Sequence, residues 1–217
     1  MSLDVIFLKL MSGMGVTVSI FLLTLLFSIP LGLPISLARM SKNKVLSFIS
    51  GIYISVMRGT PLMLQIIVIY FLPFYGLGIN VTAGYRFIAV IIAFSLNYAA
   101  YFAEIYRSGI QSIPKGQYEA AQILGYSGVQ TFVRIVMPQM FKRVLPAMTN
   151  EIITLVKDTS LSFAIATAEM FTMAKQIAAK EASLMPLMAA GVFYYIFNFI
   201  VAIICKKVEK KYDYYKI

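Results

Sequence analysis

The sequence predicts an all-α polytopic membrane protein with five transmembrane helices, and three observations lead to this fold class. Hydrophobic residues make up 60% of the 217 positions, charged residues make up only 13%, and the mean hydropathy is +0.82. A soluble domain of this size would lack the polar side chains to cover its surface. Four stretches carry no charge: residues 10–38, 59–85, 87–103 and 182–205. Because about 20 helical residues cross a ~30 Å hydrocarbon core, each stretch reaches or approaches the length of a span.

The predicted spans form a single transmembrane domain, residues 1–217. They cover residues 13–37, 60–76, 86–109, 142–166 and 185–205. Residues 45–57 are uncharged but too short to cross, so we expect them at the membrane interface or packed on the bundle. The amino-terminal segment carries Asp4 and Lys9 and lacks a basic region with a cleavage site, so it does not read as a signal peptide.

The basic residues predict the orientation, because Lys and Arg gather on the cytoplasmic side of membrane proteins. Thirteen of them fall on the side of the carboxyl terminus: Arg39, Lys42, Lys44, Arg107, Lys115, Arg134, Lys142, Arg143, Lys206, Lys207, Lys210, Lys211 and Lys216. Four fall on the opposite side: Lys9, Arg86, Lys175 and Lys180. Arg58 and Lys157 are left unassigned. We therefore expect a multi-pass protein of the inner cell membrane with its amino terminus outside and its carboxyl terminus in the cytoplasm.

Composition also argues against several kinds of site. The chain has no His and a single cysteine, Cys205, so it offers neither a metal cluster nor an internal disulfide. It lacks the G-x-x-x-x-G-K-[ST] loop that holds ATP, and no cofactor is expected on this chain. The net charge of +10 is explained by topology and by attraction to anionic lipid, so no nucleic-acid partner is predicted.

The polar connector between the third and fourth spans, residues 111–141, carries the most informative pattern. Its defined positions are Glu119, Ala120, Ala121, Gly125, Ile135 and Pro138. Their spacing resembles the E-A-A-x3-G-x9-I-x-L-P loop of the permease subunits of ABC importers, with Met137 where that pattern has Leu. We expect a cytoplasmic helix from Tyr118 to Phe132. Glu119 would then lie at the positive end of the helix dipole, Gly125 would allow a break or a close approach, and Pro138 would end the helix before the next span.

Two further patterns narrow the resemblance to the polar amino acid uptake branch of these permeases. Residues 58–65 read Arg-Gly-Thr-Pro-Leu-x-x-Gln, in which Thr60 can cap a helix and Pro61 suits its first position. Residues 150–161 are similar to the N-x5-K-D-T-S-L segment of the same branch, with six residues in place of five between Asn150 and Lys157. Together the three patterns cover residues 58–161, about half of the chain.

The resemblance implies partners as well as a fold. The connector would be a coupling helix that fits a groove on an ATPase subunit. Two ATP-binding subunits would bind ATP and Mg²⁺ on the cytoplasmic side, and an extracellular solute-binding protein would deliver the amino acid. Since one chain supplies one coupling helix, a second permease copy is expected. A homodimer is favoured, and a paralogous partner is the alternative.

Acidic residues inside the predicted spans are the candidate substrate site. A charge at the bilayer centre costs about 2.5–3.5 kcal/mol, so Glu104, Glu151 and Asp158 should face the bundle interior. Asn97, Tyr101, Glu104 and Ser108 share one helical stripe, and Glu151, Thr154 and Asp158 share another. We expect the two stripes to converge on one cavity with more acid than base, suited to a basic amino acid. The candidate substrate-binding residues are Glu151, Asp158, Glu104, Asn97, Tyr98 and Tyr101.

Three alternatives stay open at this level. In the first, the acids are structural, with Glu104 paired to Arg107 and Asp158 to Lys157 or to another helix. In the second, the protein is an ion-coupled secondary amino acid transporter, which would share the polar stripes but need no ATPase. In the third, Glu151 and Asp158 serve an intramembrane enzyme, although the chain lacks a nucleophile motif.

Overall fold

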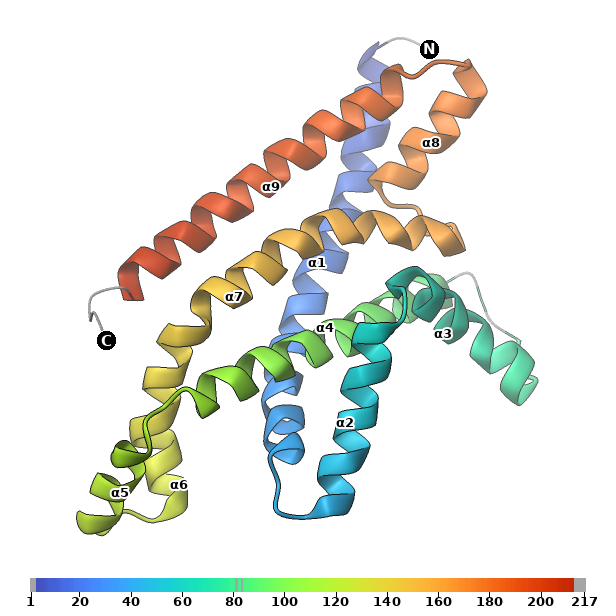
Figure 1. Ribbon diagram of the computed structural model, residues 1–217. Coiled ribbons are helices and arrows are strands. Elements are labelled where there is room, and N and C mark those ends of the chain that lie inside the picture. The colour runs from blue at the N-terminus through green and yellow to red at the C-terminus, as the bar shows by residue number, and fades with distance from the viewer. Residues whose placement is uncertain (1–2, 81, 83, 213–217) are drawn as a thin grey trace.

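All regular structure that the computed structural model describes, in residues 3–80, 82 and 84–212, is helical. The order of elements is α1 (Leu3–Arg39), α2 (Lys44–Gly59), α3 (Leu62–Leu77), α4 (Tyr85–Gln111), α5 (Lys115–Ile123), α6 (Gly128–Thr131), the π turn η1 (Phe132–Val136), α7 (Met137–Asp158), the 3₁₀ turn η2 (Thr159–Ile165), α8 (Met170–Glu181) and α9 (Met185–Tyr212). The all-α prediction is confirmed. Figure 1 shows α4 crossing α1 near the middle of the molecule, with α5 and α6 at one end and α8 at the other.

Helix α4 is the core of the bundle because small residues let α1 approach it closely. Its buried face includes Ala89, Ala93, Ala99 and Ala103. On the α1 side, a Cβ added at Gly32 would lie only 2.8 Å from the Cβ of Phe102. Close contact between small residues is the usual basis of helix packing in membranes. The position of α4 is therefore fixed by its contact with α1, and α4 in turn positions the polar residues of its second half.

The prediction of five spans is only partly matched. By length and composition, α1, α4 and α9 can cross a membrane, and α2 with α3 adds a fourth span if the pair counts as one, bent by 112°. Helix α7 does not qualify because it carries Lys142, Arg143, Glu151, Lys157 and Asp158. A span tolerates this many charges only where they face protein or water. Composition alone therefore cannot identify such a helix as a membrane span.

Helix α2 corrects the expected second span, residues 60–76. The helix found in place of that span is α3, which begins at Leu62. The segment before it forms a separate helix, α2, which packs on α1 and α4. The hydroxyl of Tyr53 donates to the backbone carbonyl of Leu96 on α4 at 2.5 Å, and Asn43 caps the start of α2 through the N–H groups of Val45 and Leu46. Of the two expectations for residues 45–57, packing on the bundle is the one the structure shows.

The expected fourth span, residues 142–166, is also displaced. Helix α7 begins at Met137 and ends at Asp158, where hydroxyl groups begin to bond the backbone of the preceding turn. Thr159 donates to the carbonyl of Val156 at 2.8 Å, and Ser160 donates to that of Lys157 at 2.7 Å. Such local bonds compete with the α-helical ladder, which explains the 3₁₀ turn that follows.

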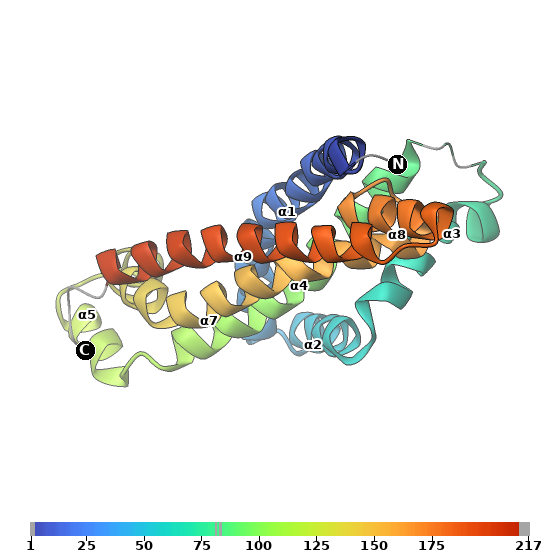
Figure 2. The same cartoon turned by 90° about the horizontal axis from the view of Figure 1, so that it is seen from above.

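Helix α8 was not predicted from the sequence. Its start is organised by Glu169, a fully buried carboxylate that accepts from the backbone N–H of Phe171 at 2.7 Å and of Thr172 at 2.6 Å. The hydroxyl of Tyr194 on α9 donates to the same group at 2.9 Å. Figure 2 shows α9 running back along α7 from α8. Glu169 thus ties the two carboxyl-terminal helices together.

Candidate functional site

A cavity of about 500 Å³ opens between the end of α2, the second half of α4 and the first half of α7. Its lining residues are Arg58, Tyr101, Glu104, Ile105, Ser108, Gly109, Ser112, Arg143, Val144, Ala147 and Glu151. The structure therefore brings together Tyr101, Glu104 and Ser108 of one predicted stripe and Glu151 of the other. Asn97, Tyr98 and Asp158 do not line this cavity.

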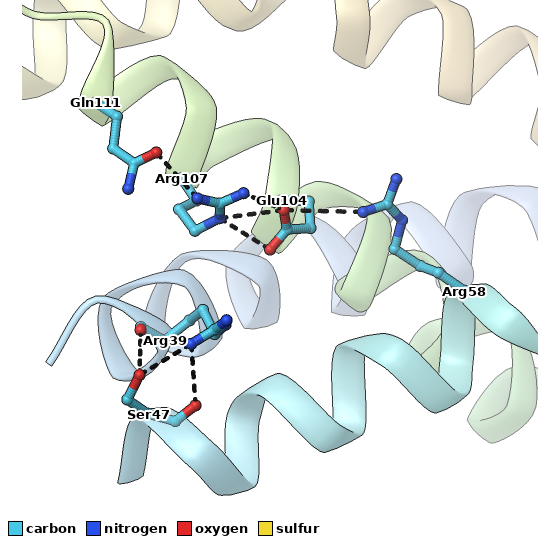
Figure 3. A network of polar contacts seen from close by, with 6 residues as sticks. All are labelled: Arg39, Ser47, Arg58, Glu104, Arg107 and Gln111. Carbon is cyan, nitrogen blue, oxygen red and sulfur yellow. Dashed lines mark hydrogen bonds and ion pairs between the residues drawn. The ribbon is translucent and has the colours of Figure 1, made fainter. Parts of the chain in front are cut away.

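Glu104 is the centre of a charged network on the α4 wall (Figure 3). Arg107 donates to it from Nε at 3.0 and 3.1 Å and from Nη2 at 2.7 Å. Arg58, from the end of α2, approaches the same carboxylate at 3.8 Å and places its guanidinium 5.2 Å from the ring centroid of Tyr101. The structural alternative for Glu104, pairing with Arg107 three residues later, is thus present in the fold.

Glu151 lies on the opposite wall, and its carboxylate has no hydrogen bond or ion pair within the described part of the chain. Arg143, two turns earlier on α7, donates to the backbone carbonyl of Ser112 at the end of α4. Arg143, Ala147 and Glu151 follow at i, i+4 and i+8, which is the spacing of one helical face. That spacing is a sequence signal that could have placed Arg143 in the cavity.

The prediction of an excess of acid in the cavity is wrong. Its lining contains two carboxylates, Glu104 and Glu151, and two guanidinium groups, Arg58 and Arg143. The prediction counted only the acids along two stripes, used Arg143 as a topology signal and left Arg58 unassigned. Arg58 lies in the last turn of α2, and Arg143 lies near the start of the expected fourth span, where basic residues usually mark the membrane surface.

Asp158 pairs with another helix, which is one of the two structural alternatives expected for it. The hydroxyl of Tyr98 on α4 donates to its Oδ2 at 2.7 Å. Tyr98 is only 2% exposed and stacks on Phe94, so this bond joins α4 to the end of α7 behind the cavity. Pairing of Asp158 with Lys157 is not seen, whereas pairing with another helix is.

Asn97 explains much of the Arg-Gly-Thr-Pro-Leu-x-x-Gln pattern. Its side-chain amide donates to the carbonyl of Met57 at 2.9 Å and to Oε1 of Gln65 at 3.0 Å. Gln65 in turn donates to the same carbonyl at 2.9 Å and to the hydroxyl of Thr60 at 2.8 Å. These bonds satisfy backbone groups that the bend between α2 and α3 releases. Thr60 therefore ends α2, with Pro61 preceding α3, and does not cap the start of a span as expected.

The connector does not form the continuous helix predicted from Tyr118 to Phe132. Helix α5 begins at Lys115, which places Glu119 in its middle, and it ends at Ile123, two residues before the left-handed Gly125 with φ of 76°. The N–H of Gly125 donates to Gln122 and that of Tyr126 donates to Ala121, both at 3.0 Å. This pair of bonds is a Schellman motif, for which glycine is the favoured residue. The predicted break at Gly125 is therefore confirmed.

The surface of the connector is apolar to an unusual degree for a segment rich in turns. Ile123 is 85% exposed, Leu124 is 73% exposed and Val129 is 75% exposed. Of the three-residue Glu-Ala-Ala segment, Ala121 is buried while Glu119 and Ala120 are exposed. Burial raises the pKa of the Tyr118 hydroxyl above its ordinary value.

Ile135 and Pro138 lie where the connector passes into α7. Pro138 does not end a helix, because the π turn of Phe132–Val136 precedes it and the chain stays helical. The N–H of Met137 donates five residues back to Phe132, and the side chain of Gln139 donates to the carbonyl of Ile135 at 3.0 Å. The wider π turn accommodates a proline that cannot donate to the α-helical ladder.

The chain is similar to known transport proteins over most of its length. Residues 25–214 match the family described as "Binding-protein-dependent transport system inner membrane component". The L-cystine transport system permease protein TcyB of Bacillus subtilis (strain 168) is 37% identical over 209 residues, covering 95% of this chain and 87% of that protein. The arginine transport system permease protein ArtQ of the same organism is 37% identical over 203 residues, covering 93% and 91%. A solved structure, "Crystal structure of an amino acid ABC transporter with histidines", superposes with a TM-score of 0.84 at 30% identity over 94% of both chains.

Proposed function

Because the chain belongs to the family of binding-protein-dependent transport system inner membrane components, as a permease subunit of the amino acid ABC importers, we propose that it moves polar, preferentially basic, amino acids into the cell by alternating access. ATP hydrolysis in such importers is carried by a separate ATPase subunit. None of these relatives is an ion-coupled secondary transporter, so that alternative gains no support. The chain shows no motif for an enzyme of its own.

The observation that carries the proposed preference is the free carboxylate of Glu151 on the α7 wall of the cavity. A carboxylate in a water-poor cavity attracts a cationic group, and a charge-assisted hydrogen bond contributes about 1.5–3 kcal/mol. The ammonium or guanidinium group of a basic amino acid would satisfy it. Glu104 is already paired with Arg107, so its contribution to a cationic ligand is smaller.

The remaining predicted residues receive different roles in this proposal. Tyr101 and Glu104 contact the ligand from the α4 wall. Asn97, Tyr98 and Asp158 hold that wall in place, since Asn97 bonds Met57 of α2 and Gln65 of α3, and Tyr98 bonds Asp158 of α7. A cavity of about 500 Å³ has room for one amino acid side chain and its backbone groups.

The proposed partners follow from the connector. Ile123, Leu124 and Val129 form an exposed apolar surface, which we call the connector patch, and an ATPase subunit would cover it. Two such subunits would bind ATP and Mg²⁺, and this chain would bind no cofactor. A second copy of the permease would complete a homodimer, and a solute-binding protein would deliver the ligand from outside. The mass of the purified complex tests this stoichiometry, and a single copy of the chain would contradict it.

The proposed orientation is amino terminus outside and carboxyl terminus in the cytoplasm, with five crossings if α2 with α3 counts as one and α7 as another. Single cysteines at Lys115 and Lys180 test it, in a background in which Cys205 is replaced. Reagent that cannot cross the membrane should label position 180 in intact cells and leave position 115 unlabelled. Labelling of position 115 from outside would overturn the orientation.

The substrate proposal is tested by replacing Glu151 with glutamine. Glu151→Gln should weaken binding of L-arginine, L-lysine and L-histidine by roughly 10- to 150-fold, and that of L-glutamine by much less. Glu209→Gln is the matched control, because it makes the same chemical change near the end of α9 and away from the cavity lining. Competition binding to the purified permease–ATPase complex gives the ratio. An unchanged ratio of basic to neutral ligands in Glu151→Gln would show that Glu151 does not select the substrate.

A further inference from the structure

Arg58 is the cavity cation that its neighbours leave least satisfied. Arg143, the other cation of the lining, donates to the carbonyl of Ser112, and Arg107 beside the cavity makes three contacts with Glu104 at 2.7–3.1 Å. Arg58 makes one ion-pair contact, at 3.8 Å. The side chain of Arg58 is 43% exposed, although it lines the cavity. A guanidinium carries five N–H donors in a planar fork, so most of those of Arg58 remain available.

The charges around Glu104 do not cancel. Arg58 and Arg107 bring two positive charges to one carboxylate, and Arg107 engages both of its oxygen atoms. One positive charge is thus left over at the α4 wall, and Figure 3 shows the Arg58 guanidinium reaching from α2 toward that wall. The ring of Tyr101 lies 5.2 Å away and holds the guanidinium by a cation–π contact without using its hydrogen-bond donors.

We propose that Arg58 binds the α-carboxylate of the transported amino acid. This inference rests on the proposed function, and it adds that the cavity requires a free carboxylate and not only a cationic side chain. Arginine is suited to this task because its fork matches a carboxylate with two parallel hydrogen bonds. With Arg58 on one wall and the unpaired Glu151 on the other, the cavity is dipolar and complements a zwitterion.

Paired ligands that differ only in the carboxylate test this role. The pairs are L-arginine with agmatine, L-lysine with cadaverine, L-histidine with histamine, and L-glutamine with 4-aminobutanamide. Binding is measured on the purified permease–ATPase complex without the solute-binding protein, which would impose its own selection. In the unmodified protein, the amino acid should bind at least about 10-fold tighter than its amine, as expected for one charge-assisted contact.

In Arg58→Gln, one charge-assisted contact is lost. We therefore expect the affinity for the amino acid to exceed that for its amine by at most about threefold. The amine should bind unchanged or tighter, because a cation has been removed from the cavity. Arg58→Lys keeps the positive charge but loses the planar fork of donors. Its ratio of amino acid to amine affinity should lie between those of the unmodified protein and Arg58→Gln. Arg39→Gln is the control, because Arg39 is a nearby cation that bonds Ser47 and does not line the cavity. Its ratio should match that of the unmodified protein.

Glu104→Gln separates a direct contact from a supporting one. If Arg58 binds the ligand, removing its competitor frees the guanidinium, and the ratio of amino acid to amine should rise. If Arg58 only supports the network, Glu104→Gln should lower the ratio as Arg58→Gln does, and that outcome would overturn the inference. Equal binding of amino acid and amine by the unmodified protein would also overturn it, while leaving the proposed function in place. Failure of all four amino acids to bind would contradict the proposed function itself.

Discussion

The cavity lies between α4, α7 and the end of α2, and the connector joins α4 to α7, yet the two regions are built in opposite ways. In the cavity, charged side chains from α2, α4 and α7 line the walls, and Glu104 and Arg143 meet partners within the chain, namely Arg107 and the carbonyl of Ser112 at the end of α4. In the connector, the contacts fix the backbone at the turn of Gly125 and at the Ser127–Gln130 capping box, and Arg134 lies over the ring of Tyr126. The side chains of the connector patch contact little in this chain. One chain therefore supplies both walls of the cavity, whereas the connector patch stays exposed in the part of this chain that the structure describes.

The largest expected effect comes from disturbing the packing that forms the cavity. A Cβ added at Gly109 on α4 would lie 2.2 Å from Cγ1 of Val144 and 3.0 Å from Cγ of Met140, both on α7. Gly109→Val should destabilise the protein at the upper end of the ~1–3 kcal/mol typical of overpacking. Thermal unfolding of the permease in detergent measures this.

Gly191→Val is the control for this change, because a Cβ at that position of α9 meets nothing within 4 Å. Adding Val144→Ala to Gly109→Val removes the nearest atom and should restore part of the loss. If Gly109→Val unfolds at the same temperature as the unmodified protein, α4 and α7 are not held as closely as the structure shows.

The second effect should appear only when a partner is present. Leu124→Ser removes an apolar side chain that is 73% exposed, so the stability of the isolated permease should not change. If an ATPase subunit covers the connector patch, its association should weaken by about 1.5–3 kcal/mol, or roughly 10- to 150-fold. Co-purification and a binding titration with the ATPase subunit give the number.

Val45→Ser serves as the control for the connector patch, because Val45 is 66% exposed at the start of α2. It should leave ATPase association unchanged. Equal weakening by both variants would show that the effect is not specific to the connector patch.

The smallest effect concerns the turn itself. Gly125 has φ of 76° and open space where a Cβ would lie, so its requirement is conformational and not steric within this chain. Gly125→Ala should loosen the end of α5 by about 1–2 kcal/mol, whereas Gly125→Asn should cost less because asparagine tolerates this conformation. Hydrogen exchange of the α5 amides measures the difference. Equal protection in all three proteins would show that the turn at Gly125 does not stabilise the end of α5.

Sequence patterns located most helices of this fold because hydropathy and periodicity are local properties. They missed α8, whose start depends on Glu169 and on Tyr194 of another helix. They also missed Arg58 and Arg143 as cavity residues, because each reaches the cavity only after distant helices pack together. Periodicity along one helix identifies its polar face, but which helix covers that face is a tertiary property. The predicted cavity was therefore located on α4 and α7 with the wrong charge balance.

The bend between α2 and α3 has a consequence for sequence variation. Gln65 and Asn97 both bond the carbonyl of Met57 and not its side chain, so position 57 needs only an apolar residue of suitable size. Positions 65 and 97, in contrast, must supply amide groups that also bond each other. A change at either one therefore leaves polar groups at the bend without partners unless the other changes with it, although 32 residues separate them along the chain. Positions 65 and 97 are therefore expected to change together, whereas position 57, whose carbonyl they bind, can accept other apolar residues of suitable size.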